Sequence, residues 1–238
     1  MKALLSAERI EQHSRPGLWP GRTLADFFDD AVARTPDKVA VTGLNSSSGA
    51  ITTLSYRQMH RLVKRMALGL IRLGVGTGEV VSCQLPNWWQ FAALHLACIR
   101  IGAVTNPLMP IFRHRELRYM LGFAESKVLV IPRRYRGFDY PAMVDELRGD
   151  LPCLARVLAV GDTQHDTFEA ELLQPRLEDE PGAEKLLAGR QSSPDDIVQL
   201  LYTSGTTGEP KGVLHTSNTL VSIIQCYARR LGLDEDTV

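Results

Sequence analysis

The sequence has little cysteine, and its few cysteines do not form the pattern of a disulfide framework or a zinc site. The 238 residues include four cysteines, which are far apart and contain no C-x-x-C pair. Disulfide-stabilised domains and structural zinc sites need several closely spaced cysteines. We therefore interpret all four as free thiols, in the core or on the surface: Cys83, Cys98, Cys153 and Cys226.

An excess of charge of either sign is also missing. Lys and Arg together number 27, Asp and Glu together number 27, and the formal net charge is zero. Proteins that bind nucleic acid usually carry an excess of basic residues on one face. The bulk charge therefore gives no indication of a nucleic-acid partner.

Long apolar runs are absent as well. The first 20 residues contain two glutamates and two arginines where a secretory signal peptide would have its apolar centre. No apolar run reaches the roughly 20 residues of a membrane-spanning helix. We therefore expect no transmembrane segment and a cytoplasmic location.

What the sequence does contain is an alternation of strand-like and helix-like segments. Short apolar runs alternate with amphipathic segments of about ten to fifteen residues, which is typical of an α/β fold with a mostly parallel sheet and helices on both faces. Thr23 and Ser55 are expected to cap two of the helices. The predicted strands are 39–42, 51–54, 79–85, 102–107, 127–131, 156–160 and 197–202, with a short one at 213–214. The predicted helices are 23–34, 55–73, 88–101, 113–122 and 140–148, with one more from 217.

Two segments do not follow this alternation. Residues 1–22 are expected to be an irregular lead-in, and residues 23–238 one domain. Within that domain, 174–196 is polar and rich in helix breakers, so we expect a surface excursion there. Its acidic run, 177–182, is interpreted as a solvated face, with a docking role as the alternative.

One polar segment has a composition that indicates ligand binding. An apolar run at 197–202 leads into a loop, and residues 204–211 of this loop contain three hydroxyl side chains, two glycines, Pro210 and Lys211. Glycines let a ligand approach the main chain, exposed N–H groups form anion-binding concavities, and lysine is a common phosphate partner. These features predict a polyphosphate-binding loop. The alternative is an ordinary polar surface loop, because the same residue types are common in turns.

The letters of this loop decide between known phosphate-binding motifs. The Walker A pattern G-x-x-x-x-G-K-[ST] does not fit, because Lys211 is followed by Gly212. The string Tyr202 to Gly212 instead closely resembles the signature loop of the adenylate-forming superfamily, which contains acyl- and aryl-CoA ligases, peptide-synthetase adenylation domains and luciferases. The pair Thr206-Thr207 looks more like the CoA ligases.

Other segments support this resemblance. Residues 85–88, 102–108, 116–117 and 126–130 are similar to upstream core segments of the family, and 23–41 to its opening helix and strand. The similarity covers roughly 20–231 and is weakest between about 133 and 195. The resemblance implies that the chain forms the first part of the large N-terminal domain of an adenylate-forming enzyme.

The resemblance also implies a chemistry. In the family a carboxylate attacks the α-phosphate of Mg·ATP to give an acyl-adenylate and pyrophosphate, and a thiol, usually of coenzyme A, then displaces AMP. It implies a carboxylic acid, ATP, Mg²⁺ and coenzyme A as ligands, a place in fatty acid metabolism, and no metal ligands in this sequence. The residues implied to hold the ATP phosphates are Thr203, Ser204, Gly205, Thr206, Thr207, Gly208 and Lys211.

The sequence departs from the family at one position after the loop. Many relatives have a Thr-His pair where this chain has Thr216-Ser217, and His215 lies two positions earlier. We do not transfer the role of the family histidine to any of these residues. His215 is interpreted as a structural residue near a strand end. We assign no role to His60, His95, His114 and His165.

Several family motifs are not found in the sequence. It has no Tyr-Gly-x-Thr-Glu segment, no ribose-binding Thr-Gly-Asp and no small C-terminal domain with its adenylation lysine. We therefore expect a fragment of a ligase or a natural remnant, inactive alone and prone to self-association through an unpaired sheet edge and an uncovered apolar face. The alternatives are a stand-alone nucleotide- or phosphate-binding module without turnover, and a purely structural protein.

Overall fold

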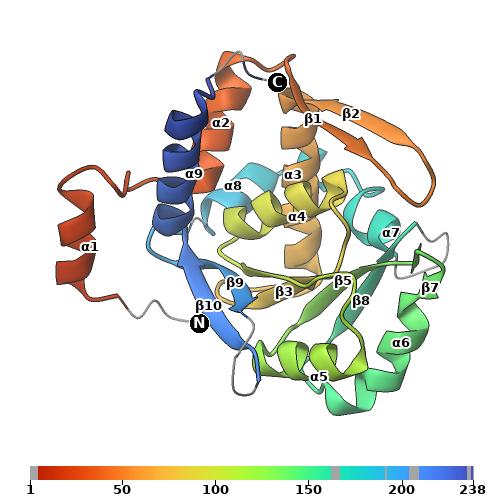
Figure 1. Cartoon of the computed structure of the whole chain (residues 1–238). Coiled ribbons are helices and arrows are strands. Elements are labelled where there is room, and N and C mark those ends of the chain that lie inside the picture. The colour runs from red at the N-terminus through yellow and green to blue at the C-terminus, as the bar shows by residue number, and fades with distance from the viewer. Residues whose placement is uncertain (1–4, 162–166, 191, 204–208, 235–236, 238) are drawn as a thin grey trace.

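A computed structural model of the chain describes residues 5–161, 167–190, 192–203, 209–234 and 237. Its centre is a six-stranded sheet with the order β10-β9-β4-β3-β5-β8 (Figure 1). All neighbouring pairs run parallel except β9 and β10, which are antiparallel. The strands are β3 (Val80–Cys83), β4 (Val104–Pro107), β5 (Val128–Pro132), β8 (Arg156–Val160), β9 (Ile197–Thr203) and β10 (Lys211–Thr216).

Helices cover both faces of this sheet, as predicted (Figure 1). The alternation of side chains along β5 shows why both layers are needed. Val128 and Val130 join the core beneath α3 and α4, whereas Leu129 and Ile131 join the core beneath α5 and α6. A strand buried on both sides must be covered on both sides. The helices are α3 (Tyr56–Arg72), α4 (Trp89–Arg100), α5 (His114–Phe123) and α6 (Tyr140–Leu147).

Side-chain caps fix where the helices begin. Thr23 Oγ1 accepts a hydrogen bond from Asp26 N at 3.2 Å, and the Asp26 carboxylate accepts one from Thr23 N at 2.8 Å, which starts α2 (Leu24–Arg34). Ser55 starts α3 in the same reciprocal way. Capping boxes of this kind satisfy backbone donors that have no partner within the helix. Both predicted caps are confirmed.

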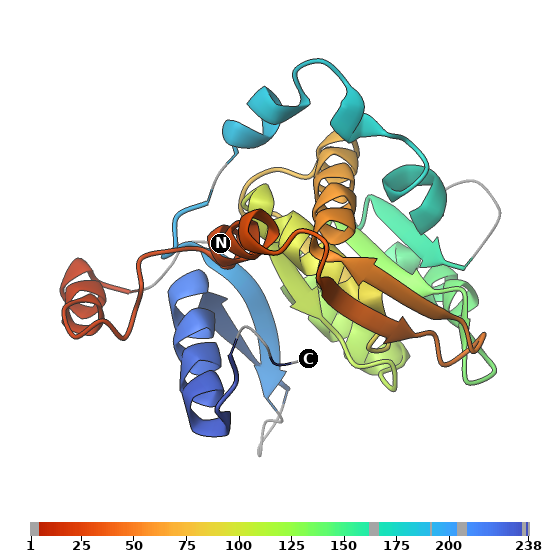
Figure 2. The same ribbon diagram turned by 90° about the horizontal axis from the view of Figure 1, so that it is seen from above.

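A hairpin of β1 (Val39–Leu44) and β2 (Ile51–Ser55) lies apart from the main sheet (Figure 2). It confirms the two predicted strands around a polar turn. A second, very short hairpin of β6 (Arg134–Tyr135) and β7 (Phe138–Asp139) was not expected.

The lead-in is not wholly irregular. It contains α1 (Ala7–Ser14), which starts where Ser6 Oγ accepts a hydrogen bond from Arg9 N at 3.3 Å. None of the residues of α1 is buried, and both views show it standing apart from the sheet (Figures 1 and 2). The prediction missed this helix because a helix without a buried face has no apolar stripe in its sequence.

The segment 174–196 is also more ordered than predicted. It contains the short helices η2 (Leu177–Asp179) and α8 (Ala183–Ala188), and it follows α7 (Phe168–Leu172), which was also missed. The Glu178 side chain is only 6% exposed and is paired with Arg65 of α3. Interpreting the whole acidic run as a solvated face was therefore wrong at Glu178. The error arises because Arg65 is distant in the sequence, and local composition does not show such a partner.

The last helix, α9 (Ser217–Leu231), carries large apolar side chains that face solvent. Ile223, Ile224, Tyr227 and Leu231 are 47–64% exposed. None of the helices in the described part of the chain is long and apolar enough to cross a membrane. The exposed apolar side chains of α9 therefore favour association of the chain in water.

We expect the 238-residue chain to self-associate through this face of α9, because burial of exposed apolar side chains is favourable. Light scattering at rising concentration should report dimers or larger species. The double variant Ile224→Glu/Tyr227→Glu should shift them towards monomer, whereas Arg229→Glu, on the same helix outside this face, should not. A monomer mass for the unaltered chain at every concentration would contradict this expectation.

A second prediction concerns acid stability and His95 of α4. Its Nδ1 lies 3.0 Å from Thr105 Oγ1 on β4, and burial lowers the pKa of His95 from 6.5 to about 4. Between these values the unfolded chain binds a proton that the folded chain does not. The unfolding free energy should therefore fall as the pH drops from 6.5 to about 4, by at most about 1.4 kcal/mol per pH unit. Chemical denaturation at several pH values in this window gives the unfolding free energy as a function of pH. This free energy should fall less steeply with decreasing pH for His95→Asn than for the unaltered chain. An equal pH dependence would refute the assignment to His95.

Candidate phosphate-binding site

The predicted phosphate-binding loop connects the two antiparallel strands at one side of the sheet. β9 runs parallel to β4, with Gln199 opposite Thr105, and its last residue is Thr203. β10 begins at Lys211, which pairs with Thr203. The loop therefore leaves from the carboxyl end of β9, the edge of a parallel sheet at which α/β proteins bind ligands. This arrangement confirms the predicted order of strand, loop, strand and helix.

The structure describes two of the seven predicted phosphate-binding residues. Thr203 and Lys211 are register partners at the base of the loop, and both are exposed to solvent. An exposed hydroxyl and an exposed ammonium on adjacent strands suit an anionic ligand. The other five lie outside the described residues, and their role stays a prediction: Ser204, Gly205, Thr206, Thr207 and Gly208.

A cavity of about 320 Å³ lies at the same edge of the sheet. The chain leaves β3 towards α4 on one face and leaves β4 towards α5 on the other, so the two connections diverge and open a crevice. The cavity is lined mainly by the residues that end three strands: Cys83, Leu85, Asn87, Pro107, Leu108, Met109, Pro110, Leu201 and Tyr202, with Phe91 and Phe112.

The lining of this cavity contains no activated nucleophile among its described residues. Burial raises the pKa of the Cys83 thiol to about 12, so this thiol stays protonated. The neighbouring Gln84 donates from Nε2 to the carbonyls of Met109 and Phe112, both at 3.0 Å, and fixes the loop after β4. The cavity is thus a preformed, mostly apolar crevice beside the end of β9.

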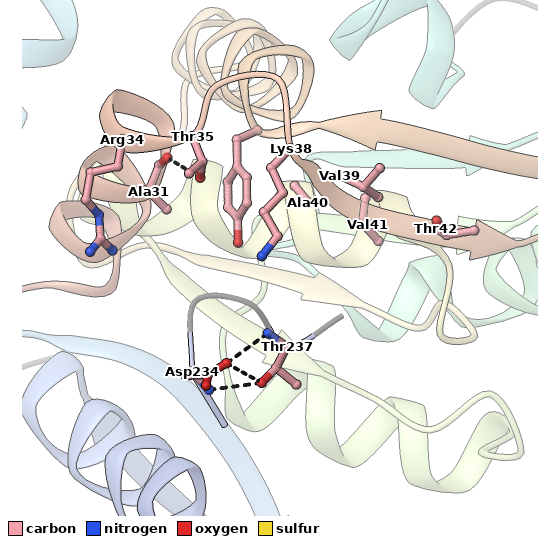
Figure 3. Close-up of a pocket in the computed structure, with 11 residues that line it drawn as sticks. Ala31, Arg34, Thr35, Lys38, Val39, Ala40, Val41, Thr42, Asp234 and Thr237 are labelled. Carbon is pink, nitrogen blue, oxygen red and sulfur yellow. Dashed lines mark hydrogen bonds between the residues drawn. The ribbon is translucent and has the colours of Figure 1, made fainter. Parts of the chain in front are cut away.

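A second hollow, of about 390 Å³, lies elsewhere (Figure 3). Its lining comes from the end of α2, from β1, and from Asp234 and Thr237, where Asp234 Oδ1 accepts hydrogen bonds from the backbone N and the Oγ1 of Thr237 at 3.0 and 2.9 Å. No residue of β9 or β10 is among the residues that line it. We therefore assign the site to the carboxyl edge and not to this hollow.

The residues after the loop hold α9 in place. Thr216 caps the helix through a reciprocal pair with Thr219. Ser217, at the position where many relatives of the predicted family have histidine, is completely buried, and its Oγ has no hydrogen-bond partner among the described residues. His215 lies in β10 one residue before its end, and burial lowers its pKa. This position agrees with the interpretation of His215 as a residue near a strand end.

Comparison with known proteins identifies the fold and its family. The model of the family described as "AMP-binding enzyme" matches residues 28–238. The chain belongs to the AMP-binding enzyme family. The assignment confirms the resemblance predicted from the string Tyr202 to Gly212.

Curated relatives and a solved structure in the AMP-binding family agree with this assignment. The chain is similar to a medium-chain fatty-acid–CoA ligase of Escherichia coli (28% identical over 95% of this chain and 38% of that protein). It is also similar to a 2,3-dihydroxybenzoate-AMP ligase of Bacillus subtilis (31% identical over 97% and 40%). The structure of Mycobacterium smegmatis MbtA without ligand matches with a TM-score of 0.75 and 27% identity, over 92% of this chain and 38% of that chain.

The chain thus spans about 40% of the length of the curated AMP-binding relatives it matches. The match to this solved structure confirms the predicted fold class, the first part of the N-terminal domain of an adenylate-forming enzyme. Relatives with CoA-ligase and AMP-ligase names place the chain in a family of ligases. The activity and substrates of a complete protein are matters for proposal.

Sequence reasoning missed the residues of the AMP-binding domain that support the loop from α5. Tyr119 contacts Pro210 in the loop exit, and Phe123 contacts Tyr202 in β9. The only local signal is that these two aromatic residues are four apart on a helix, and so share a face. Such spacing does not show which strands the face meets.

Proposed function

We propose that the chain is the N-terminal part of an ATP-dependent carboxylic acid:CoA ligase. In the proposed reaction the carboxylate of the acid attacks the α-phosphate of Mg·ATP, forming an acyl-adenylate and releasing pyrophosphate. The thiol of coenzyme A then attacks the acyl carbon, forming a thioester and releasing AMP. Membership of the AMP-binding family and the ligase names of the relatives support this proposal.

The observation that carries the proposal is the pairing of Thr203 with Lys211 at the carboxyl edge of the sheet. Both side chains are exposed there, at the base of the glycine-rich loop. They would hold the β- and γ-phosphates together with the loop residues predicted from the sequence. Displacement at phosphorus needs positioning and charge stabilisation more than covalent help, and a fixed hydroxyl and ammonium supply both.

The proposal also concerns the molecule that accepts the acyl group. The relatives include proteins named as CoA ligases and one named as an AMP ligase. The Thr206-Thr207 pair, which resembles the CoA ligases, favours coenzyme A as the acceptor. Mg²⁺ is proposed to enter as the ATP complex. A stand-alone nucleotide-binding module and a purely structural protein are the competing outcomes of the tests below.

Lys211→Ala should weaken binding of Mg·ATP to the 238-residue chain by about 10- to 100-fold, because it removes a charge-assisted contact to the phosphates. Titration calorimetry measures this directly. Lys185→Ala is the matched control, since Lys185 is an exposed lysine on α8, away from the sheet edge. Equal heats for Lys211→Ala and the unaltered chain would refute the phosphate-binding role. Absence of binding in both would favour a structural protein.

We also propose that these residues bind ATP without completing the adenylation step. The 238-residue chain spans only about 40% of the length of the curated ligases it matches. Acid-dependent exchange of labelled pyrophosphate into ATP by the 238-residue chain should therefore stay at background. Exchange that depends on added acid and disappears in Lys211→Ala would overturn this part of the proposal.

A further inference from the structure

Helix α5 lies against both strands that carry the loop. Its residues Tyr119 and Phe123 are one turn apart on the same face, and their rings stack with centroids 5.8 Å apart and planes inclined by 20°. The Phe123 ring meets Tyr202 of β9 edge-on, with centroids 6.3 Å apart. The end of β10 near the loop also lies beside α5 (Figure 1). Aromatic pairs in these geometries favour one relative placement of the elements that carry them.

Two hydrogen bonds connect α5 to the two sides of the loop. On the β9 side, the Tyr202 hydroxyl donates to the carbonyl of Met120 at 2.9 Å. On the β10 side, the Tyr119 hydroxyl donates to the carbonyl of Pro210 at 3.0 Å. Burial raises the pKa of the Tyr202 phenol above its ordinary value, and the neighbouring Tyr119 raises it further, so Tyr202 remains a donor.

The shape of β10 also fits α5. Gly212 pairs with Tyr202, and a Cβ atom at position 212 would lie 2.9 Å from Leu200 Cδ1 and 3.0 Å from Phe123 Cε1. Both distances are too short for an ordinary contact with an added carbon. The absence of a side chain at Gly212 therefore lets the Phe123 ring lie against the strand next to Lys211.

We propose that Tyr119 is a positioning residue for the β9–β10 hairpin, which carries the proposed phosphate-binding loop. The ring of Phe123 packs against the same hairpin. Tyr119 holds the carbonyl of Pro210, the residue directly before Lys211, and the proline ring fixes its own φ angle. The start of β10 is thereby placed before a ligand arrives. Placing a binding group in advance reduces the conformational entropy lost on binding. This inference rests on the proposed role of Lys211 in holding ATP phosphates.

Tyr119→Phe is the variant that tests the inference, since it keeps the ring and removes only the hydroxyl. One neutral hydrogen bond corresponds to an affinity change of about three- to tenfold. We expect Mg·ATP to bind more weakly by up to that factor in calorimetry, with a melting temperature lower by a few degrees at most. Hydrogen exchange of backbone amides in 209–213 should become about three- to tenfold faster, while exchange in α5 and β5 should stay the same.

Tyr140→Phe is the matched control. The Tyr140 hydroxyl donates to the carbonyl of Pro110 at 2.8 Å, so the variant removes the same kind of bond from another loop. Because Pro110 lines the crevice, this control applies to hydrogen exchange, which should stay unchanged in 209–213. Phe123→Leu is a second test variant, because it keeps an apolar side chain but removes the stacking with Tyr119. It should change both readouts in the same direction as Tyr119→Phe.

The two readouts separate this inference from the proposed function. If the unaltered chain binds Mg·ATP through Lys211 and Tyr119→Phe binds it equally well, the positioning role is overturned. If the unaltered chain does not bind Mg·ATP, the proposed function fails, and hydrogen exchange decides the rest. Faster exchange in 209–213 for Tyr119→Phe then supports the conclusion that Tyr119 of α5 positions the hairpin, and unchanged exchange overturns it.

Discussion

The pairing of β9 with β4 is the contact on which the site depends. It attaches the β9–β10 hairpin to the parallel part of the sheet through β4, a strand that begins about 90 residues earlier in the chain. Burial of apolar side chains on both faces of β9 stabilises its pairing with β4. Ile197 and Leu200 pack with Val80 and Val104 on one side, and Val198 packs with the α2–α4 layer on the other. Because β9 is fixed from both faces, its carboxyl end at Thr203 has a defined position, and Lys211 follows from the antiparallel register.

The site thus combines an apolar frame with polar residues at its edge. Strands β3, β4 and β5 are almost completely buried, whereas Thr203 and Lys211 are exposed. A rigid frame that presents a few polar groups to solvent is the usual arrangement of ligand sites in α/β folds. Helix α5 completes this frame, because it contacts both strands of the hairpin and follows directly after β4, the strand on which β9 pairs.

The sequence predicted the features that depend on local pattern. The caps at Thr23 and Ser55, the strands of the sheet and the strand–loop–strand order around the glycine-rich loop all follow from periodicity and short-range hydrogen bonding. The features it did not predict depend on contacts between distant residues. The pair Arg65–Glu178 spans 113 residues, and the bond from Tyr119 to Pro210 spans 91. Helix α1 was missed for a different reason, since Ile10 is its only large apolar residue and none of its residues is buried.

We propose that the β9–β10 hairpin holds the phosphates of ATP. A crystal structure of the chain grown with Mg·ATP would test this proposal. We expect electron density for the β- and γ-phosphates beside the side chains of Thr203 and Lys211, at the carboxyl edge of the sheet. Density for the nucleotide in the hollow between α2, β1 and Asp234 instead, with the hairpin free of ligand, would contradict it (Figure 3).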